Sequence, residues 1–439
     1  MSRIAVVLFG IGSVLAIASP ASAQRLRGGI IPENVAQQHG LHRAWVIQVA
    51  VDPGVGRVDY AVLNDGLLLI QTDQATLHVL DAETRRTLWK AQVGRRRSPT
   101  SAPTCGAEHV IATNGAMLYL FDRRDGRLIW EKKLESVPSA GAVIGAGRVY
   151  VPLVSGMVVG YRLPEPPDDE HPAERETFER VLHFRGNGMA DAPPIFTEHC
   201  VVWGTDKGDV CAATGDEMLG KFRFRSRQAI SAPLAYFPPF IYAASRDGYV
   251  YGLRDERGRK RWQFSAGNPV IERPVVIDDA LYAISETGDL FKLTLDTGLE
   301  EWSVSGISRF VAASQTKLYM VDMAGRLVIL DIGTGARLGA IPTEYLKLKI
   351  INTQTDRIYL GSPSGMIQCL RERELLEPIR HTLPELVTDD EEAGDKKDGD
   401  KPAAEPDMED KPDMPADDDD NPFADKAAAA AGEEMKDDE

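Results

Sequence analysis

Short apolar stretches alternate with polar turns along most of the chain. One unit of this pattern, LYLFDRRDGRLIW, runs from Leu118 to Trp130 and holds an apolar strand, a polar turn at Asp122–Gly126 and a second strand. Variants run from Leu77 to Trp89, from Val250 to Trp262 and from Leu290 to Trp302. Short strands that are bounded by turn residues and recur along a chain indicate all-β structure.

The length of the repeat can be measured from a small residue that lies two positions before the apolar strand of each unit. These residues are Ala75, Ala116, Gly156, Gly208, Gly248, Gly288, Gly325 and Gly365. The steps between them are 41, 40, 52, 40, 40, 37 and 40 residues, and the longest step contains the polar insertion Pro164–Glu176. Four strands per unit of about 40 residues is the composition of a β-propeller blade. The period therefore predicts an eight-bladed β-propeller over residues 41–383.

An aromatic residue follows the small residue by 14 positions in five of the units. These aromatics are Trp89, Trp130, Phe222, Trp262 and Trp302. Tryptophan can bury a large apolar face against a neighbouring blade while its indole N–H finds a hydrogen-bond acceptor. Gly126, Gly258, Gly298 and Gly335 supply the left-handed backbone that the preceding tight turn requires. We expect these residues to dock one blade on the next, as structural rather than ligand-binding groups.

The two ends of the propeller complement each other. The stretch Arg43–Val51, with Trp45, resembles the last strand of a repeat whose other strands are missing upstream. The eighth repeat has three strands, in KIINTQ, RIYLG and MIQCL, but its fourth would fall in Leu375–His381, which contains proline and lacks tryptophan. We therefore predict that Arg43–Val51 completes the last blade. Each repeat is expected to open with a short proline-marked strand, as in SAPT from Ser101 and ERPV from Glu272.

The charge of the chain is concentrated at its C-terminal end. The net charge is −16 over 439 residues, but the stretch from Glu385 to Glu439 holds 23 acidic and 6 basic residues, a charge of −17. The rest carries +1, so the folded part is nearly neutral, whereas a nucleic-acid-binding domain is typically basic. Residues 384–439 contain few apolar side chains, which predicts a disordered acidic tail.

The N-terminus has the pattern of an export signal. Arg3 precedes the apolar stretch Ile4–Ile17, and Ala21-Ser22-Ala23 forms a small-residue cleavage pattern. The apolar stretch is shorter than the roughly 20 residues of a membrane-spanning helix. We predict a signal peptide over 1–23, a lead-in over 24–40 and an exported protein, periplasmic or extracellular, with no membrane span. There is no cysteine near Ala23, so the sequence does not indicate a lipid anchor. The four cysteines of the chain are expected to be buried, reduced thiols.

The turn-and-tryptophan motif resembles the repeat of the pyrroloquinoline-quinone (PQQ) type propellers. The closest matches are Asp122, Asp125, Gly126 and Trp130, and Thr297, Gly298 and Trp302. The export signal, the eight repeats and the size resemble the BamB-type scaffold proteins of outer-membrane protein assembly. This resemblance implies a non-catalytic propeller, monomeric within a larger complex, with protein partners of the cell envelope and no cofactor.

The same repeat occurs in PQQ-dependent dehydrogenases, which form the alternative class. Their alcohol-dehydrogenase branch carries adjacent cysteines over the cofactor and a Ca²⁺ site with a catalytic aspartate. This chain has no adjacent pair of cysteines, and its eight histidines are scattered. We therefore assign no catalytic, cofactor-binding or metal-binding residue from the sequence.

Two groups of arginines are candidates for an interaction site. They are Arg95, Arg96 and Arg97, and, in the stretch FRFRSR, Arg223, Arg225 and Arg227. In a propeller the connections between blades share a face with the glycine turns, so both groups are expected on that face. Alternation with Phe222 and Phe224 is expected to place the second group on one side of its strand. Guanidinium groups bind carboxylates in a bidentate manner. We predict an anion-binding patch for an acidic segment of a partner or for the chain's own tail.

Overall fold

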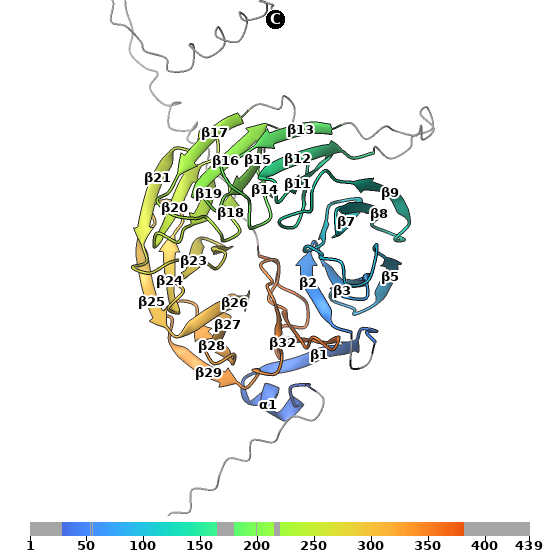
Figure 1. The fold of residues 1–439 in the computed structure, drawn as a ribbon. Coiled ribbons are helices and arrows are strands. Elements are labelled where there is room, and N and C mark those ends of the chain that lie inside the picture. The colour runs from blue at the N-terminus through green and yellow to red at the C-terminus, as the bar shows by residue number, and fades with distance from the viewer. Residues whose placement is uncertain are drawn as a thin grey trace, which may run out of the picture. The chain divides into compact units, whose positions relative to one another are not determined.

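A computed structural model describes residues 29–381 apart from 53, 55, 165–179, 199 and 215–219. The predicted signal peptide, residues 24–28 of the lead-in, most of the polar insertion and the predicted acidic tail lie outside the described residues. The described part forms eight four-stranded antiparallel sheets arranged as the blades of a β-propeller, as the repeat length predicts (Figure 1).

Seven blades each consist of four consecutive strands. Blade 1 contains β2 Val58–Asn64, β3 Leu67–Thr72, β4 Thr76–Asp81 and β5 Thr87–Gln92. Blade 2 contains β6 Thr104–Cys105, β7 His109–Asn114, β8 Met117–Asp122 and β9 Leu128–Lys133. Blade 3 contains β10 Val143–Gly145, β11 Arg148–Pro152, β12 Met157–Arg162 and β13 Arg180–Arg185. Blades 4 and 5 contain β14 Ile195–Phe196, β15 Cys200–Gly204, β16 Asp209–Thr214 and β17 Gly220–Arg225; and β18 Ala235–Phe237, β19 Phe240–Ala244, β20 Tyr249–Arg254 and β21 Lys260–Ser265.

The remaining blades complete the ring. Blades 6 and 7 contain β22 Val275–Ile277, β23 Ala280–Ile284, β24 Asp289–Thr294 and β25 Glu300–Ser305; and β26 Ile307–Ala313, β27 Lys317–Asp322, β28 Leu327–Asp331 and β29 Arg337–Ile341. Blade 8 contains β30 Leu348–Ile350, β31 Ile358–Gly361, β32 Met366–Glu372 and the N-terminal strand β1 Leu41–Gln48.

The burial of each strand follows its place in the blade. The first strands of neighbouring blades contact one another, as β2 contacts β6 and β30, so they form the inner circle of the ring. Second strands such as β15 and β19 are buried along their whole length, because both faces of each sheet pack against neighbouring blades. Fourth strands such as β21 alternate between exposed and buried positions, as expected at the outer edge.

The proline-marked stretches lead into the first strands and do not form them, so that prediction was wrong. Pairing begins directly after the proline: β6 starts at Thr104 after Pro103, and β22 starts at Val275 after Pro274. Proline has no backbone N–H and cannot donate to the ladder of a sheet. The residue therefore marks where the inner strand begins.

The tryptophan of a blade docks on the third-to-fourth-strand turn of the next blade. The Trp262 Nε1 atom donates a hydrogen bond of 2.9 Å to the backbone oxygen of Leu295. The ring of Trp262 lies against Gly298, where an added Cβ would come within 3.0 Å of it. Gly298 has a φ of +66°, so the turn requires glycine both for its backbone and for the space that the ring occupies.

The same contact recurs around the ring. The indole nitrogens donate to backbone oxygens of the next blade at 3.1 Å from Trp45 to Ala82, at 2.8 Å from Trp89 to Arg123 and at 3.3 Å from Trp302 to Ile332. Phe222 packs against Gly258 in the same manner without the hydrogen bond, and Trp130 packs against the core shared by blades 2 and 3.

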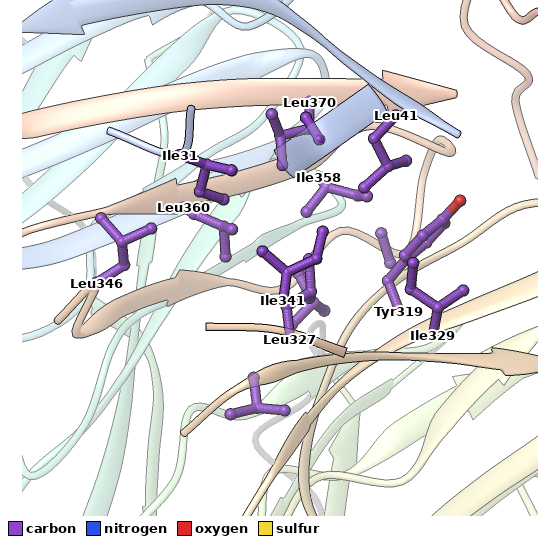
Figure 2. Packing of buried hydrophobic residues seen from close by; sticks show 14 of the residues in the cluster. Ile31, Leu41, Tyr319, Leu327, Ile329, Ile341, Leu346, Ile358, Leu360 and Leu370 are labelled. Atoms are coloured by element: carbon purple, nitrogen blue, oxygen red, sulfur yellow. The ribbon is translucent and has the colours of Figure 1, made fainter. Parts of the chain in front are cut away.

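Blade 7 has a glycine at the docking position, and the N-terminal segment fills the space that an aromatic ring takes elsewhere. Gly339 stands where five other blades carry tryptophan, and a Cβ there would lie 2.6 Å from Nδ1 of His39. His39 follows the short helix α1, Glu33–Gln38. Ile31 and Leu41, on either side of the helix, pack with side chains of blades 7 and 8 in one buried cluster (Figure 2). The N-terminal segment therefore seals the seam between these blades.

Strand β1 closes the ring, as the sequence predicts. It pairs antiparallel with β32, with Trp45 opposite Cys369 and Gln48 opposite Met366. The strand spans Leu41–Gln48 and not Arg43–Val51, because the partner strand begins at Met366. The next residue, Val49, donates its N–H to the glycine turn that precedes β32, at Gly365.

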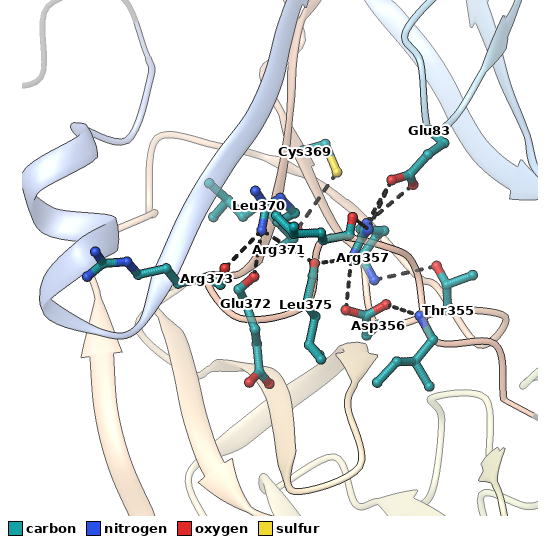
Figure 3. A network of polar contacts seen from close by, with 12 residues as sticks. Glu83, Thr355, Asp356, Arg357, Cys369, Leu370, Arg371, Glu372, Arg373 and Leu375 are labelled. Atoms are coloured by element: carbon teal, nitrogen blue, oxygen red, sulfur yellow. Dashed lines mark hydrogen bonds and ion pairs between the residues drawn. The ribbon is translucent and has the colours of Figure 1, made fainter.

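A buried charge network joins blade 8 to blade 1 (Figure 3). The guanidinium group of Arg357 is fully buried and lies 3.0 Å from Glu83 of blade 1 and 2.9 Å from the buried carboxylate of Asp356. It also donates to the backbone oxygens of Leu375 and Leu376. These bonds hold the segment after β32 against blades 8 and 1.

Candidate functional site

Both arginine groups lie on one face of the ring, which we call the loop face. It carries the connections from the fourth strand of one blade to the first strand of the next and the turns between second and third strands. Hydrogen bonds tie the two kinds of loop together: Ser226 donates to Gly208 at 2.9 Å, and the Arg95 N–H donates to Asn114 Oδ1 at 3.0 Å. The placement predicted from the sequence therefore holds.

The first arginine group, in the connection between blades 1 and 2, has a fixed backbone and exposed side chains. Asn114 accepts from the Arg95 N–H and donates from Nδ2 to the Arg95 oxygen, both at 3.0 Å. Arg96 pairs with Asp52 at 3.3 Å, but both side chains are more than half exposed, so water screens the pair. The guanidinium groups of Arg95 and Arg97 make no hydrogen bond or ion pair with a described residue. Two charges are thus free on a rigid loop.

The second group is largely occupied by an internal partner. Arg223 and Arg225 lie on the same side of β17, as the alternation predicts, and both bind the buried carboxylate of Asp209; Arg225 Nε lies 2.8 Å from Oδ1. Asn187 donates to the same carboxylate at 3.1 Å. Burial alone would raise the pKa of Asp209, but hydrogen bonds from Arg225 and Arg223 outweigh it and hold the pKa below its usual range. The two arginines and Asp209 together carry one positive charge.

Arg227 lies beyond the end of β17, so it does not continue the side that Arg223 and Arg225 share. Its backbone N–H donates to Asp247 at 3.0 Å, which fixes the loop, while its side chain is exposed. The expectation that all three arginines share one side of a strand was therefore wrong, because the strand ends at Arg225.

The two groups do not form one patch. Arg95–Arg97 connect blades 1 and 2, whereas Arg223–Arg227 lie at the junction of blades 4 and 5, three blades further around the ring. The loop face offers two separate basic spots, of which the first has the more available charge.

Sequence reasoning missed a further set of basic side chains near the inner rim of the loop face. Arg246 donates from Nε to Ser231 at 3.4 Å, and Arg309 lies 3.4 Å from Glu272. Arg273 follows Glu272 directly and leads into β22. These arginines belong to blades 5, 6 and 7, and no motif in the sequence marks them.

The described residues contain no group of three or more His, Cys, Asp or Glu side chains that could hold a metal ion. The four cysteines are free and buried, and burial raises the pKa of both Cys105 and Cys211 to about 11. Among the described residues no helix is long and apolar enough to cross a membrane.

Comparison with known proteins places the chain among propellers. The sequence profile of the family described as outer membrane protein assembly factor BamB matches residues 35–165 and 196–345. The sequence matches none of the curated proteins compared with it.

Three solved structures are similar over most of their length. BamB from Moraxella catarrhalis is 18% identical with a TM-score of 0.59, covering 76% of this chain and 100% of that one. The computationally designed Ika8 protein is 14% identical with a TM-score of 0.58, covering 73% and 98%. The C-terminal WD40 domain of Sif2 is 10% identical with a TM-score of 0.56, covering 75% and 98%. At these identities the structures show a shared fold.

Proposed function

The chain belongs to the family of outer membrane protein assembly factor BamB, and from this premise we propose that it is an exported, non-catalytic β-propeller scaffold that binds protein partners of the cell envelope. The role extends to outer-membrane protein assembly or envelope organisation. The protein acts as a monomeric propeller within a larger complex, in the periplasm or outside the cell after cleavage near Ala23.

The observation that carries this proposal is the family match, which includes residues of all eight blades, blade 8 through its strand β1. A ring of blades that dock through tryptophan and glycine is a rigid body, and a rigid body presents its loops at fixed positions. The connections on the loop face are therefore suited to bind a partner with little loss of conformational entropy.

The partner surface is assigned to the loop face with Arg95–Arg97 at one contact and Arg223–Arg227 at another. The free guanidinium groups of Arg95 and Arg97 favour acidic segments of a partner. Because these side chains are exposed, salt should weaken the contact, since the screening length falls to about 8 Å at physiological ionic strength.

Site-specific photocrosslinking in cells tests the surface. A photoreactive residue in place of Arg96, on the loop face, should crosslink to a defined envelope protein. The same residue in place of Arg257, in the turn between β20 and β21 on the opposite face, is the control and should give no such product. Equal crosslinking of one protein at both positions, or none at Arg96 and at Arg227, would contradict the assignment.

A charge-matched pair of triple variants tests the electrostatics. Changing Arg95, Arg96 and Arg97 to alanine should weaken binding of the crosslinked partner and reduce its dependence on salt. The control changes Arg124, Arg127 and Arg257 to alanine, which removes the same charge from the opposite face. If the two triple variants bind the partner equally well, the loop-face arginines do not bind it.

The alternative, a PQQ-dependent dehydrogenase, has its own test. Purified full-length protein is mixed with the quinone and Ca²⁺, passed through a desalting column and assayed with alcohols or sugars and a redox dye. Retained quinone absorbance together with substrate-dependent dye reduction would replace the scaffold proposal. For the scaffold we expect neither signal.

A further inference from the structure

The outer wall of blades 3, 4 and 5 carries a concentration of positive charge. The fourth strands β13, β17 and β21 form this wall and follow one another along the outer rim of the ring (Figure 1). Their sequences contain no aspartate or glutamate. Their exposed positions hold seven arginines and lysines, which are Arg180, Arg185, Lys221, Arg223, Arg225, Lys260 and Arg261. We call this surface the basic wall.

The basic wall is bounded on both sides by strands of different charge. The outer strand of blade 6, β25, exposes Glu300 and Glu301 and contains no arginine or lysine. The outer strand of blade 2, β9, exposes Glu131 together with Lys133. The propeller as a whole is nearly neutral, so the positive charge of the wall is a local property of three successive blades.

Two described carboxylates pair with the basic wall and leave most of its charge in place. Glu135, in the connection between blades 2 and 3, contacts Arg180. The buried carboxylate of Asp209 is shared by Arg223 and Arg225. Seven positive charges against these two negative charges leave five, and water reaches all seven side chains.

The arginines of the basic wall retain hydrogen-bond donors for a further carboxylate. A guanidinium group has five N–H donors in a planar arrangement. Arg225 uses Nε and one Nη atom on Asp209, and Arg223 uses one Nη atom. Arg185 and Arg261 are exposed and form no hydrogen bond or ion pair with a described residue. The wall can therefore bind carboxylates without breaking its internal pairs.

The curvature of the basic wall selects the kind of partner. Three of the eight blades take up more than a third of the ring, so the wall is convex. A flat anionic surface such as a membrane would meet the charges of one blade at a time. An extended segment of a protein can follow the curve, and guanidinium groups bind its carboxylates through two parallel hydrogen bonds.

We propose that the basic wall binds an extended acidic segment of a protein partner, with contacts to Arg185, Lys221 and Arg261 in three successive blades. This site lies on the side of the ring and goes beyond the proposed partner surface on the loop face, with which it shares only Arg223 and Arg225. The charges of the wall are exposed, so salt should weaken the binding through screening.

Fluorescence anisotropy with the full-length protein tests the basic wall, with two labelled peptides of alternating glutamate and serine as probes. The shorter peptide has six residues, the length of one outer strand. The longer has about 20 residues and spans roughly 66 Å when extended. We expect saturable binding at low salt, and tighter binding of the longer peptide, because it reaches the charges of more than one blade.

A triple variant with one change in each blade tests the residues. Arg185→Gln, Lys221→Gln and Arg261→Gln together should weaken binding of the longer peptide about tenfold, which corresponds to about 1.4 kcal/mol over three exposed pairs. None of the three side chains pairs with a described carboxylate, so the substitutions leave the internal pairs of Asp209 and Glu135 intact.

A charge-matched triple variant in blades 1 and 2 is the control. It changes three exposed basic residues to glutamine, which are Lys90, Arg124 and Lys133. It removes the same charge and should bind the longer peptide as the unchanged protein does. The predicted acidic tail is present in every protein compared, so it does not distinguish them.

A loss of affinity confined to the wall variant supports the proposal. It is overturned by no saturable binding, by equal affinity of the two peptides, by unchanged affinity in the wall variant, or by an equal loss in the control. Wall-dependent binding to phosphatidylglycerol vesicles without binding of either peptide would assign the wall to a membrane surface and also overturn it. If the wall variant does not fold, Arg185→Gln and Arg261→Gln are tested singly. A loss of about twofold in either supports the proposal, and unchanged affinity in both overturns it.

Discussion

The contact between Trp262 and Gly298 allows a sharp test of how the blades are held together. We consider the substitution Gly298→Ala in the turn between β24 and β25. It adds one methyl group at a backbone φ of +66°, against the ring of Trp262. The substitution therefore combines two separate costs, one in the backbone and one in the packing between blades 5 and 6.

Each cost has its own magnitude. A residue with a Cβ in the left-handed region costs about 1–2 kcal/mol. Placing a methyl group within 3.0 Å of a ring that is itself buried adds about 1–3 kcal/mol of overpacking. Gly298→Ala should thus lower the free energy of unfolding by roughly 2–5 kcal/mol.

A matched control isolates the backbone cost. Gly267 has a similar φ of +73°, but an added Cβ there would meet no atom within 4 Å. Gly267→Ala should therefore cost only about 1–2 kcal/mol. The difference between the two alanine variants measures the packing of the tryptophan on the turn.

A double-mutant cycle completes the test. Trp262→Ala alone should cost roughly 3–5 kcal/mol, because it removes a buried aromatic ring. In that background Gly298→Ala should cost only the backbone term, which gives a coupling energy of about 1–3 kcal/mol between the two sites. The free energies come from urea unfolding followed by circular dichroism and fluorescence, whose transitions must coincide for the values to be comparable. If Gly298→Ala costs no more than Gly267→Ala, or if its cost persists without Trp262, the docking contact does not stabilise the ring.

Three further outcomes are expected. Arg357→Leu should lower the free energy of unfolding by about 3–5 kcal/mol in the same urea assay, since it leaves the buried carboxylate of Asp356 without its cation; a loss below about 1 kcal/mol would contradict this. Asp209→Asn should cost about 1.5–3 kcal/mol at pH 7. The pKa of Asp209 is lower in the native protein than in the unfolded chain, so the ionised carboxylate stabilises the fold fully above the unfolded pKa near about 4, and this stabilisation is lost as pH falls through the native pKa. The difference in unfolding free energy between Asp209→Asn and the parent protein should therefore disappear in acid. A difference that stays constant with pH would exclude the ionised pair. Burial raises the pKa of Cys105 and of Cys211 to about 11, so both thiols should resist a thiol reagent at pH 8 in the native protein and react fully in urea. Rapid labelling of these thiols in the native protein would show that their blades open.

Much of the fold could be predicted from the sequence because its signals are local. A blade is a set of hairpins, and the turn glycines, the strand lengths and the tryptophan position all lie within one repeat. The closure by β1 could also be predicted, since an unpaired tryptophan strand at one end matched an incomplete blade at the other. The proline-marked stretches were misplaced because their composition resembles that of a strand, whereas the missing N–H of proline delays pairing until the next residue.

The candidate site was less predictable, since the chemistry of an arginine depends on its partner. Arg223 and Arg225 suggested free positive charge, but the register of the hairpin sets Arg225 opposite Asp209 and Arg223 opposite Cys211, with both guanidinium groups on one carboxylate. That pairing lies between adjacent strands and could have been found by writing out the hairpin. The pairing of Arg357 with Glu83 could not, because 274 residues separate the two side chains in the chain.

The sequence by itself determined the repeat, the number of blades and the strand that closes the ring. These follow from hydrogen bonding and packing rules that act over a few residues and repeat with a period of about 40. Only the tertiary structure decided which charges are free. Among the described residues it leaves the guanidinium groups of Arg95 and Arg97 without partners, and it pairs Arg223 and Arg225 with the carboxylate of Asp209. The physical reason is that a charge responds to everything within several ångströms, and in a ring those neighbours come from other blades.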